Sequence, residues 1–204
     1  MVNRFLPRLL LAGLLLSVVP VQAEVFRSDQ IEVELIAETT TVVPGETLWL
    51  AIRLSPIEHW HTYWKFGGDS GEATAASEWQ LPQGASAGDI LWPMPQWTPF
   101  EGTDLVTFAY EHEVFLPIPV SVPADYVGDS FDLAARIDWQ VCDEICIPGD
   151  AQFTLSLPVA ATAEADPRWV AGFAQTRANI PSSDHSLTAQ FNIHDGKVNV
   201  MVAA

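Results

Sequence analysis

The chain has 204 residues, enough for one large domain or two small ones with a sizeable hydrophobic core. Hydrophobic residues make up 49% and charged residues 17%, which excludes a disordered chain, while 15 prolines and 12 glycines indicate many turns and favour β structure. The formal net charge of −17 repels phosphate backbones and anionic lipid surfaces, so we expect no nucleic-acid partner.

Residues 1–23 have the features of an export signal. Arg4 and Arg8 supply positive charge, the apolar run Leu9–Val19 is too short to span a bilayer, and Val21-Gln22-Ala23 offers small residues for cleavage. No later stretch is apolar enough for a membrane helix. We therefore expect an exported chain whose mature part begins at Glu24.

Apolar residues then recur at every second position, as in half-buried strands. Ile31–Ala37 and Leu48–Leu54 flank a turn at Pro44-Gly45, which predicts an antiparallel pair. The segment Lys65–Pro99 is rich in Gly, Ser and Pro and is typical of a long loop, interrupted only around Trp79. Further strands are predicted at His59–Trp64, Leu105–Tyr110 and Glu113–Val120. This pattern predicts an all-β antiparallel sandwich.

The two cysteines, Cys142 and Cys146, can pair only with each other, and export favours a disulfide between them. On a straight strand four steps cover roughly 13 Å, whereas a disulfide needs Cα atoms within about 7 Å, so the chain must fold back. The strand-like runs Phe131–Val141 and Ala151–Leu157 predict two antiparallel strands joined by a bend at Asp143-Glu144-Ile145. We expect the pair near the surface, at one end of this hairpin.

The composition changes after Pro158. Ala160–Ala165 is typical of a linker, and Asp166-Pro167 followed by apolar residues predicts a short helix that ends before Pro181. A hairpin is then predicted from Leu187–Ile193 and Lys197–Val202 around Asp195-Gly196. Two strands rarely stand alone in water, so we expect residues 24–160 to form one domain, 161–181 a linker and helix, and 182–204 the start of a truncated second β domain.

Several sequence blocks carry a family resemblance. They are His59-Trp60-His61-Thr62-Tyr63-Trp64-Lys65, Gly68-Asp69-Ser70-Gly71, Trp92-Pro93, Tyr110-Glu111, Trp139-Gln140-Val141-Cys142 and Ile145-Cys146-Ile147-Pro148-Gly149. In content and order these blocks resemble the N-terminal periplasmic domain of DsbD/ScsB-type thiol:disulfide interchange proteins, over roughly residues 30 to 160. Phe66-Gly67, in place of an Asn-Pro-like pair, and His112, in place of a glycine, depart from the pattern in loops that could shape partner docking.

The resemblance implies an immunoglobulin-like module in the periplasm, within a protein attached to the inner membrane. Such a thiol:disulfide oxidoreductase passes electrons by dithiol–disulfide exchange from a membrane-embedded domain to thioredoxin-fold partners, including those of cytochrome c-type biogenesis, and needs no cofactor. Cys142 and Cys146 match the family's redox pair. The membrane domain and the thioredoxin-like domain of these proteins are absent from the sequence, so the chain is expected to carry electrons without drawing them from the cytoplasm itself.

The residues around the cysteines agree with a redox role. A bridge that closes so small a loop stabilises by only about 2 kcal/mol, which makes it a weak structural staple. Asp143 and Glu144 disfavour a neighbouring thiolate and so favour the disulfide over the dithiol, which makes the reduced pair a good electron donor. A purely structural disulfide is the alternative that cysteine number alone favours, and the sequence blocks reverse that preference.

Two other functions remain open from the residues. His59 and His61 alternate on the predicted strand and, with His112 and the thiols, could bind copper or zinc, although a structural aromatic strand is the simpler interpretation. The eight tryptophans could form a sugar-binding platform, although tryptophans of a sandwich usually fill its core.

Two predictions concern the mechanism of exchange. An exposed reduced pair would lose electrons to wrong acceptors, so we expect Lys65–Gly71 or the bend Tyr110–Glu113 to cover the sulfurs. Cys146 lies one residue further from the acidic pair than Cys142, and the family resemblance also favours the later cysteine. We therefore expect Cys146 to bond the partner and Cys142 to resolve the mixed disulfide.

Overall fold

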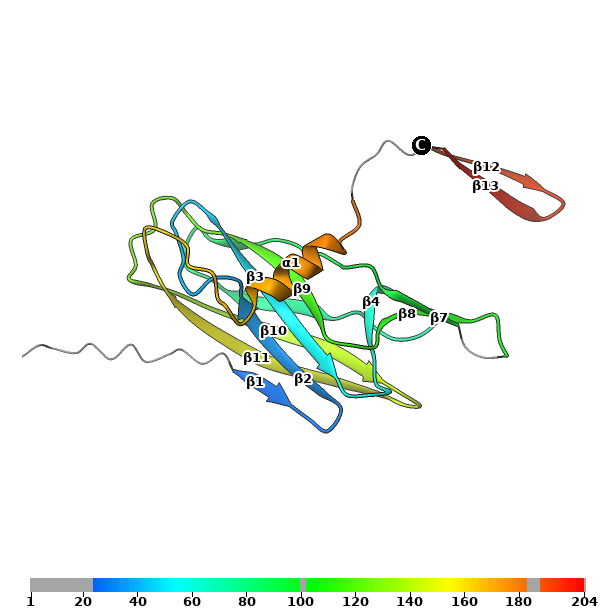
Figure 1. Cartoon of the computed structure of the whole chain (residues 1–204), viewed down its shortest axis with the longest axis horizontal. Coiled ribbons are helices and arrows are strands. Elements are labelled where there is room, and N and C mark those ends of the chain that lie inside the picture. Colours follow the sequence, from blue (N-terminus) through cyan, green and yellow to red (C-terminus); the bar gives the residue numbers. More distant parts are fainter. Residues whose placement is uncertain (1–23, 100–101, 183–187, 204) are drawn as a thin grey trace, which may run out of the picture.

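The computed structural model describes residues 24–99, 102–182 and 188–203, and the predicted export signal lies outside these residues. A five-stranded antiparallel sheet with the order β1-β2-β3-β9-β6 forms one layer (Figure 1). Its strands are β1 (Val25–Arg27), β2 (Ile31–Ala37), β3 (Thr47–Pro56), β6 (Ser86–Ala87) and β9 (Val114–Ser121). The predicted pairing of Ile31–Ala37 with the strand after Pro44-Gly45 is confirmed.

The second layer is built on a long hairpin. β10 (Ser130–Cys142) pairs along its whole length with β11 (Cys146–Pro158), and β5 (Ala75–Gln80) lies on its other edge. A smaller sheet of β4 (Thr62–Gly68), β8 (Val106–Tyr110) and β7 (Gln96–Pro99) lies at the end of the sandwich that carries the hairpin tip (Figure 1). The antiparallel sandwich and the cysteine hairpin are therefore as predicted.

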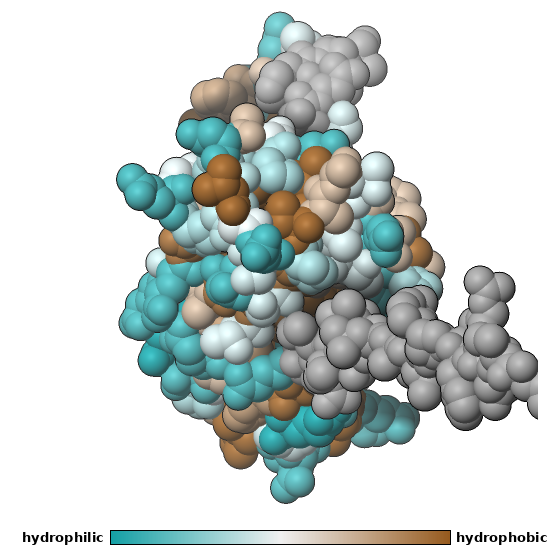
Figure 2. Space-filling view, turned by 90° about the vertical axis from the view of Figure 1, so that its left-hand side faces the viewer, coloured by the Kyte–Doolittle hydropathy of each residue, from teal (hydrophilic) through white to brown (hydrophobic). Residues whose placement is uncertain are grey.

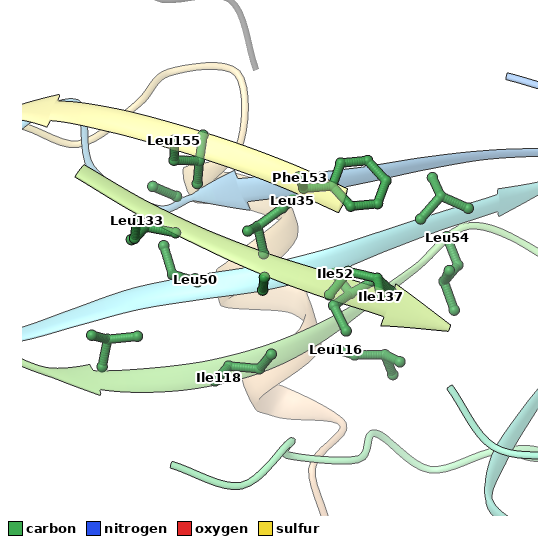
Figure 3. Close-up of a cluster of buried hydrophobic side chains, with 14 of the residues drawn as sticks. Leu35, Leu50, Ile52, Leu54, Leu116, Ile118, Leu133, Ile137, Phe153 and Leu155 are labelled. Carbon is green, nitrogen blue, oxygen red and sulfur yellow. The ribbon is translucent and has the colours of Figure 1, made fainter. Parts of the chain in front are cut away.

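The core lies between the two main sheets (Figure 3). Alternating residues of β3 and β9 face those of β10 and β11, because successive side chains of a strand point to opposite faces. The largest contributors are less than 7% exposed, and they are Leu50, Ile52, Leu54, Leu116, Ile118, Phe131, Ile137, Phe153 and Leu155. At the end of the sandwich opposite the hairpin tip, hydrophobic residues are scattered among hydrophilic ones (Figure 2). The long, well-paired strands give the hairpin tip a rigid base.

A helix covers the outer face of the five-stranded sheet. The predicted short helix is present as α1 (Val170–Ala178), and its Phe173 packs on Ile36, Ala51 and Phe115. A Cβ added at Gly172 would lie 2.5 Å from the Phe115 ring, so glycine permits the close approach of helix and sheet. The prediction that the strand Ile31–Ala37 (β2) is half-buried is therefore wrong, because the helix covers the side of the sheet that faces away from the core.

Two strand predictions need correction. The strand predicted at His59–Trp64 begins only at Thr62, since His59 lies in a turn with φ +73°. The predicted loop Lys65–Pro99 holds the end of β4 and the strands β6 and β7 in addition to the segment around Trp79. These strands were missed because they are short or contain glycine and proline, which weaken the alternation that identifies strands.

The predicted C-terminal hairpin is present as β12 (Thr188–His194) and β13 (Lys197–Ala203). Its register places Phe191 opposite Val200 and Ile193 opposite Val198, which makes one face apolar. These four side chains are 62–76% exposed. Within the described parts of the chain, no helix is long and apolar enough to cross a membrane.

Candidate redox site

The two cysteines close the tip of the β10–β11 hairpin. Cys142 is the last residue of β10 and pairs in register with Cys146, the first residue of β11, at a Cα–Cα distance of 4.1 Å. A disulfide joins them, and Asp143, Glu144 and Ile145 form the connecting bend as predicted. The register of two 13-residue strands, and not the bend alone, sets the two sulfurs face to face.

The two cysteines differ in exposure. Cys142 is 1% exposed, and its main chain both donates to and accepts from His61 at 2.9 Å. Cys146 is exposed at the edge of the tip. Because attack on a disulfide needs access to a sulfur, the asymmetry favours Cys146 as the sulfur that a partner can reach.

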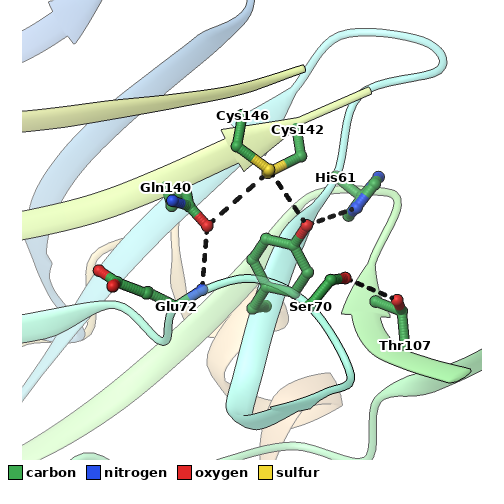
Figure 4. Close-up of a disulfide and its surroundings, with 8 residues drawn as sticks. His61, Ser70, Glu72, Thr107, Gln140, Cys142 and Cys146 are labelled. Carbon is green, nitrogen blue, oxygen red and sulfur yellow. Dashed lines mark hydrogen bonds between the residues drawn. A yellow bond between two sulfur atoms is a disulfide. The ribbon is translucent and has the colours of Figure 1, made fainter. Parts of the chain in front are cut away.

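Tyr63 of β4 contacts the disulfide. Its side chain is 2% exposed, and its hydroxyl oxygen lies 3.6 Å from Cys146 Sγ and 3.1 Å from His61 Nε2 (Figure 4). A Cβ at Gly71, where φ is +79°, would lie 2.0 Å from the Tyr63 ring, so only glycine lets this loop pass so close to the tyrosine. The Tyr63 hydroxyl therefore connects the accessible cysteine to an imidazole.

Gln140 contacts the other cysteine. Its Oε1 lies 3.8 Å from Cys142 Sγ and accepts a hydrogen bond from the Glu72 main-chain N–H at 3.0 Å (Figure 4). A disulfide sulfur has no proton to donate, so the contact with Gln140 can become a hydrogen bond only when Cys142 is reduced to a thiol. The side chain of Gln140 thus links the hairpin tip to the loop after β4.

Burial sets the charge state of the groups beside the sulfurs. Burial lowers the pKa of the His61 imidazole, and the nearby carboxylates of Glu111 and Asp143 oppose that shift. Burial also raises the pKa of the Tyr63 hydroxyl, which therefore stays protonated. The site accordingly places an intact phenol against Cys146 and an imidazole, whose neutral form burial favours, against that phenol.

The histidines do not form the face that the sequence predicted. His59 lies in the turn before β4 with its side chain 77% exposed beside Glu58, so it does not alternate with His61 on one strand. The two residues line a cleft of about 400 Å³ together with Glu111 and His112. Across the residues that the structure describes, no group of three or more His, Cys, Asp or Glu side chains has the arrangement of a metal site.

The tryptophans mostly pack against the interior. Trp139 belongs to the main core, and the partly buried tryptophans that pack against the two clusters are Trp49, Trp60, Trp64, Trp79, Trp92 and Trp169. Trp97 is the exception, at 62% exposure on β7. This distribution supports the interpretation that the tryptophans fill the core and gives no support to a sugar-binding platform.

Among the described residues, neither segment predicted to cover the sulfurs makes a hydrogen bond to them. The segment from Lys65 to Gly71, which is the end of β4 and the turn after it, packs around Tyr63 and is held by a hydrogen bond between Ser70 and Thr107 at 3.0 Å. In the bend Tyr110–Glu113, Glu111 and His112 face the cleft beside His61. The hydrogen-bond contacts to the sulfurs come instead from Tyr63 and Gln140.

Tyr63 and Gln140 lie within the sequence blocks that resemble the family, but no role was predicted for either residue. A signal for both was present. Tyr63 lies two residues after His61, and Gln140 lies two residues before Cys142 on the same face of the strand. Of the two departures from the family pattern, His112 lines the cleft beside His61, and Phe66 is 63% exposed on β4.

Fold and site together define a β-sandwich domain with a surface disulfide at a hairpin tip and one accessible sulfur. The family model "Thiol:disulfide interchange protein DsbD, N-terminal" matches residues 31–158, and the chain belongs to this family. The protein is therefore a thiol:disulfide interchange domain. No curated protein sequence matches the chain.

One solved structure supports the fold. The N-terminal periplasmic domain of ScsB from Proteus mirabilis is 20% identical, with a TM-score of 0.59 over 85% of this chain. The chain spans 64% of the length of that structure. The GAE domain of yeast GGA1 (15% identity, TM-score 0.34, 68% of this chain and 100% of that one) and the GAE domain of GGA2p from Saccharomyces cerevisiae (9%, 0.34, 66% and 97%) are more distant matches.

Proposed function

We propose that this domain carries two electrons in the periplasm from a membrane-embedded reductase domain to oxidised thioredoxin-fold proteins, with Cys142 and Cys146 as the redox pair. The observation that carries the proposal is the asymmetric disulfide at the hairpin tip of a domain of this family, with Cys142 buried and Cys146 open to solvent. The predicted export signal at residues 1–23 and the family membership support the periplasmic location.

The exchange proceeds in two steps that balance atoms and electrons. In the reduced domain the Cys146 thiolate attacks a partner disulfide, a new S–S bond forms, and the electron pair leaves on the partner's other sulfur, which takes up a proton. Cys142 then attacks the Cys146 sulfur of the mixed disulfide. This step restores the disulfide between Cys142 and Cys146 and releases the partner as a dithiol, so two electrons and two protons have moved to the partner.

A reconstitution tests the proposed function. The pre-reduced domain is mixed with an oxidised periplasmic thioredoxin-fold protein, the reaction is acid-quenched, and thiols on each protein are counted by alkylation and mass. We expect one partner disulfide to be reduced for each domain disulfide formed. A control in which both Cys142 and Cys146 are replaced by alanine should transfer nothing. If the reduced domain keeps its thiols while the partner stays oxidised, the electron-carrier role is wrong.

The proposed location has its own test. When the full coding sequence is expressed in a Gram-negative host, the protein recovered from the periplasm should begin at Glu24, as N-terminal sequencing would read. Replacing Arg4 and Arg8 by Glu should hold the chain in the cytoplasm, because the signal then loses its positive start. Recovery of the intact residues 1–23 on a periplasmic protein would contradict the assigned cleavage site.

We also propose that residues 182–204 begin a second β domain. The exposed apolar face of the β12–β13 hairpin, with Phe191, Ile193, Val198 and Val200, supports this assignment, because such a face is normally covered by further structure.

A further inference from the structure

Three polar atoms form a continuous path from the accessible cysteine to an imidazole. Cys146 Sγ lies 3.6 Å from the Tyr63 hydroxyl oxygen, and that oxygen lies 3.1 Å from His61 Nε2 (Figure 4). The Tyr63 side chain is almost completely buried, whereas Cys146 is exposed and His61 lines the cleft beside the hairpin tip. The Tyr63 hydroxyl thus bridges the Cys146 sulfur and the His61 imidazole, which need no direct contact with each other.

The chemistry of exchange calls for a base at this position. The thiolate is the attacking species, yet a free cysteine thiol has a pKa of about 8.5 and is mostly protonated at neutral pH. Asp143 and Glu144, both exposed in the bend, make a negative sulfur still less favourable. Some group must therefore take the proton from Cys146 before or during attack.

A tyrosine hydroxyl is suited to pass a proton on without keeping it. It can accept a hydrogen bond from a thiol while donating its own proton to a neutral imidazole nitrogen. Burial raises the pKa of Tyr63, so the phenolate is not a stable resting state. Burial lowers the pKa of His61, so the imidazole is in the neutral form that can accept the proton.

The charged surroundings of His61 stabilise the imidazolium that would result. Glu111 and His112 face it from the bend between β8 and β9, Glu58 and His59 from the turn before β4, and Asp143 from the hairpin tip. Glu111 and Asp143 raise the pKa of His61, which opposes the effect of burial. Burial outweighs these carboxylates at rest, and the negative charge of a thiolate at Cys146 would add to theirs and favour the imidazolium.

We infer that His61, acting through the Tyr63 hydroxyl, is the base that deprotonates the Cys146 thiol. The inference rests on the proposed function, and it names the proton path of the same site. The thiol proton moves from Cys146 Sγ to the Tyr63 oxygen while the tyrosine proton moves to His61 Nε2, leaving a thiolate and an imidazolium. Tyr63 contacts the reacting sulfur, and His61 acts through Tyr63. When the partner's thiolate leaves, it takes its proton from solvent, and His61 returns its own to solvent.

The test measures the acidity of Cys146 without any partner. In the Cys142→Ala variant Cys146 is the only thiol, and its rate of alkylation by iodoacetamide is followed from pH 4 to pH 10. We expect the alkylation midpoint to lie below the ordinary thiol value of about 8.5, because the imidazolium that forms at His61 attracts the thiolate and offsets its repulsion by Asp143 and Glu144. Adding His61→Gln or Tyr63→Phe should raise that midpoint, so that alkylation at pH 6.5 slows roughly tenfold in either case.

A matched control separates the relay from a general electrostatic effect. His59→Asn removes another histidine of the same cleft, and the side chain of His59 is 77% exposed. Asparagine tolerates the φ of +73° at this position. This control should leave the alkylation profile of Cys146 unchanged. An unchanged profile in His61→Gln, or a slowdown in Tyr63→Phe alone, would overturn the inference.

Folding of the variants does not decide the outcome. The hydrogen bonds between His61 and Cys142 involve only main-chain atoms, and Tyr63→Phe keeps the buried ring. Should either variant unfold by circular dichroism, the Cys142→Ala protein alone still tests the relay, since a midpoint at or above 8.5 would contradict it. A lowered midpoint combined with no electron transfer to any partner would overturn the proposed function and leave the relay standing.

Discussion

His61 couples the redox site to the stability of the domain. Burial lowers its pKa in the folded state, so the unfolded chain binds the proton more readily than the folded one. The contribution of His61 is therefore largest above its unfolded pKa of about 6.5, and stability is lost as the pH falls through and below that value.

The prediction for His61→Gln follows from that sign. The variant should lose less stability than the unsubstituted protein between pH 7.5 and pH 5, because glutamine has no proton to take up. Urea unfolding at the two pH values measures the difference, and carboxylate titrations common to both proteins cancel. His59→Asn, which changes an exposed imidazole, serves as the control. Equal pH dependence in His61→Gln and the unsubstituted protein would contradict the assigned burial effect.

At the scale of elements, α1 stabilises the sandwich from outside the redox site. Phe173 is 0% exposed and makes edge contacts with the Phe115 ring at a centroid distance of 5.7 Å. Phe173→Ala should lower the free energy of unfolding by about 3–5 kcal/mol, the usual cost of removing a buried phenylalanine. Gln175→Ala on the exposed side of the helix should stay within about 0.5 kcal/mol. Denaturant titration compares the two, and equal losses would mean that α1 does not cover the sheet.

The β10–β11 hairpin should survive loss of its disulfide. The strands pair over 13 residues each, whereas the bridge closes a short loop and contributes only about 2 kcal/mol. Reduction, or replacement of both cysteines by alanine, should therefore lower stability by about that amount and leave the far-ultraviolet circular dichroism unchanged. Cooperative unfolding on reduction would identify the bridge as a structural staple and contradict the redox assignment.

For the whole molecule, the sandwich was predictable where the sequence alternates cleanly. Cys142 and Cys146 could be placed on facing strands because Phe131–Val141 and Ala151–Leu157 both alternate and a disulfide restricts the register between them. The site around them was less predictable. The left-handed turn at His59 and the approach of Gly71 to Tyr63 depend on contacts between segments distant in sequence, which local patterns do not encode.

For the same reason, the sequence could not predict that β2 is buried on both faces. Ile31–Ala37 alternates as a half-buried strand should, but α1 lies more than 130 residues further along the chain and covers its outer face. Within β2, Ile36 and the carboxylate of Glu34 are buried there, and the Glu34 carboxylate lies 3.6 Å from Arg53. Alternation in the sequence identifies the face of a strand that points toward the core. It cannot predict whether a later element covers the other face.

The C-terminal hairpin should be separable from the sandwich. β12 and β13 form a two-stranded sheet that shares no strand with the other sheets, and the side chains of its apolar face are exposed. A chain of residues 24–181 should therefore unfold at the same urea midpoint as residues 24–204 and exchange disulfides at the same rate. A truncation after Val159, which removes α1, is the control and should be destabilised. A lower midpoint for residues 24–181 would show that the hairpin stabilises the sandwich.

The central claim is that Cys146 is the sulfur that exchanges with the partner, and trapping tests it most directly. Reduced Cys142→Ala and Cys146→Ala proteins are each mixed with an oxidised thioredoxin-fold protein, and mixed disulfides are mapped by mass spectrometry of non-reduced peptides. Cys142→Ala should accumulate a covalent complex through Cys146, since no resolving thiol remains, and Cys146→Ala should give little, because Cys142 is buried. A complex formed preferentially through Cys142 would contradict the account.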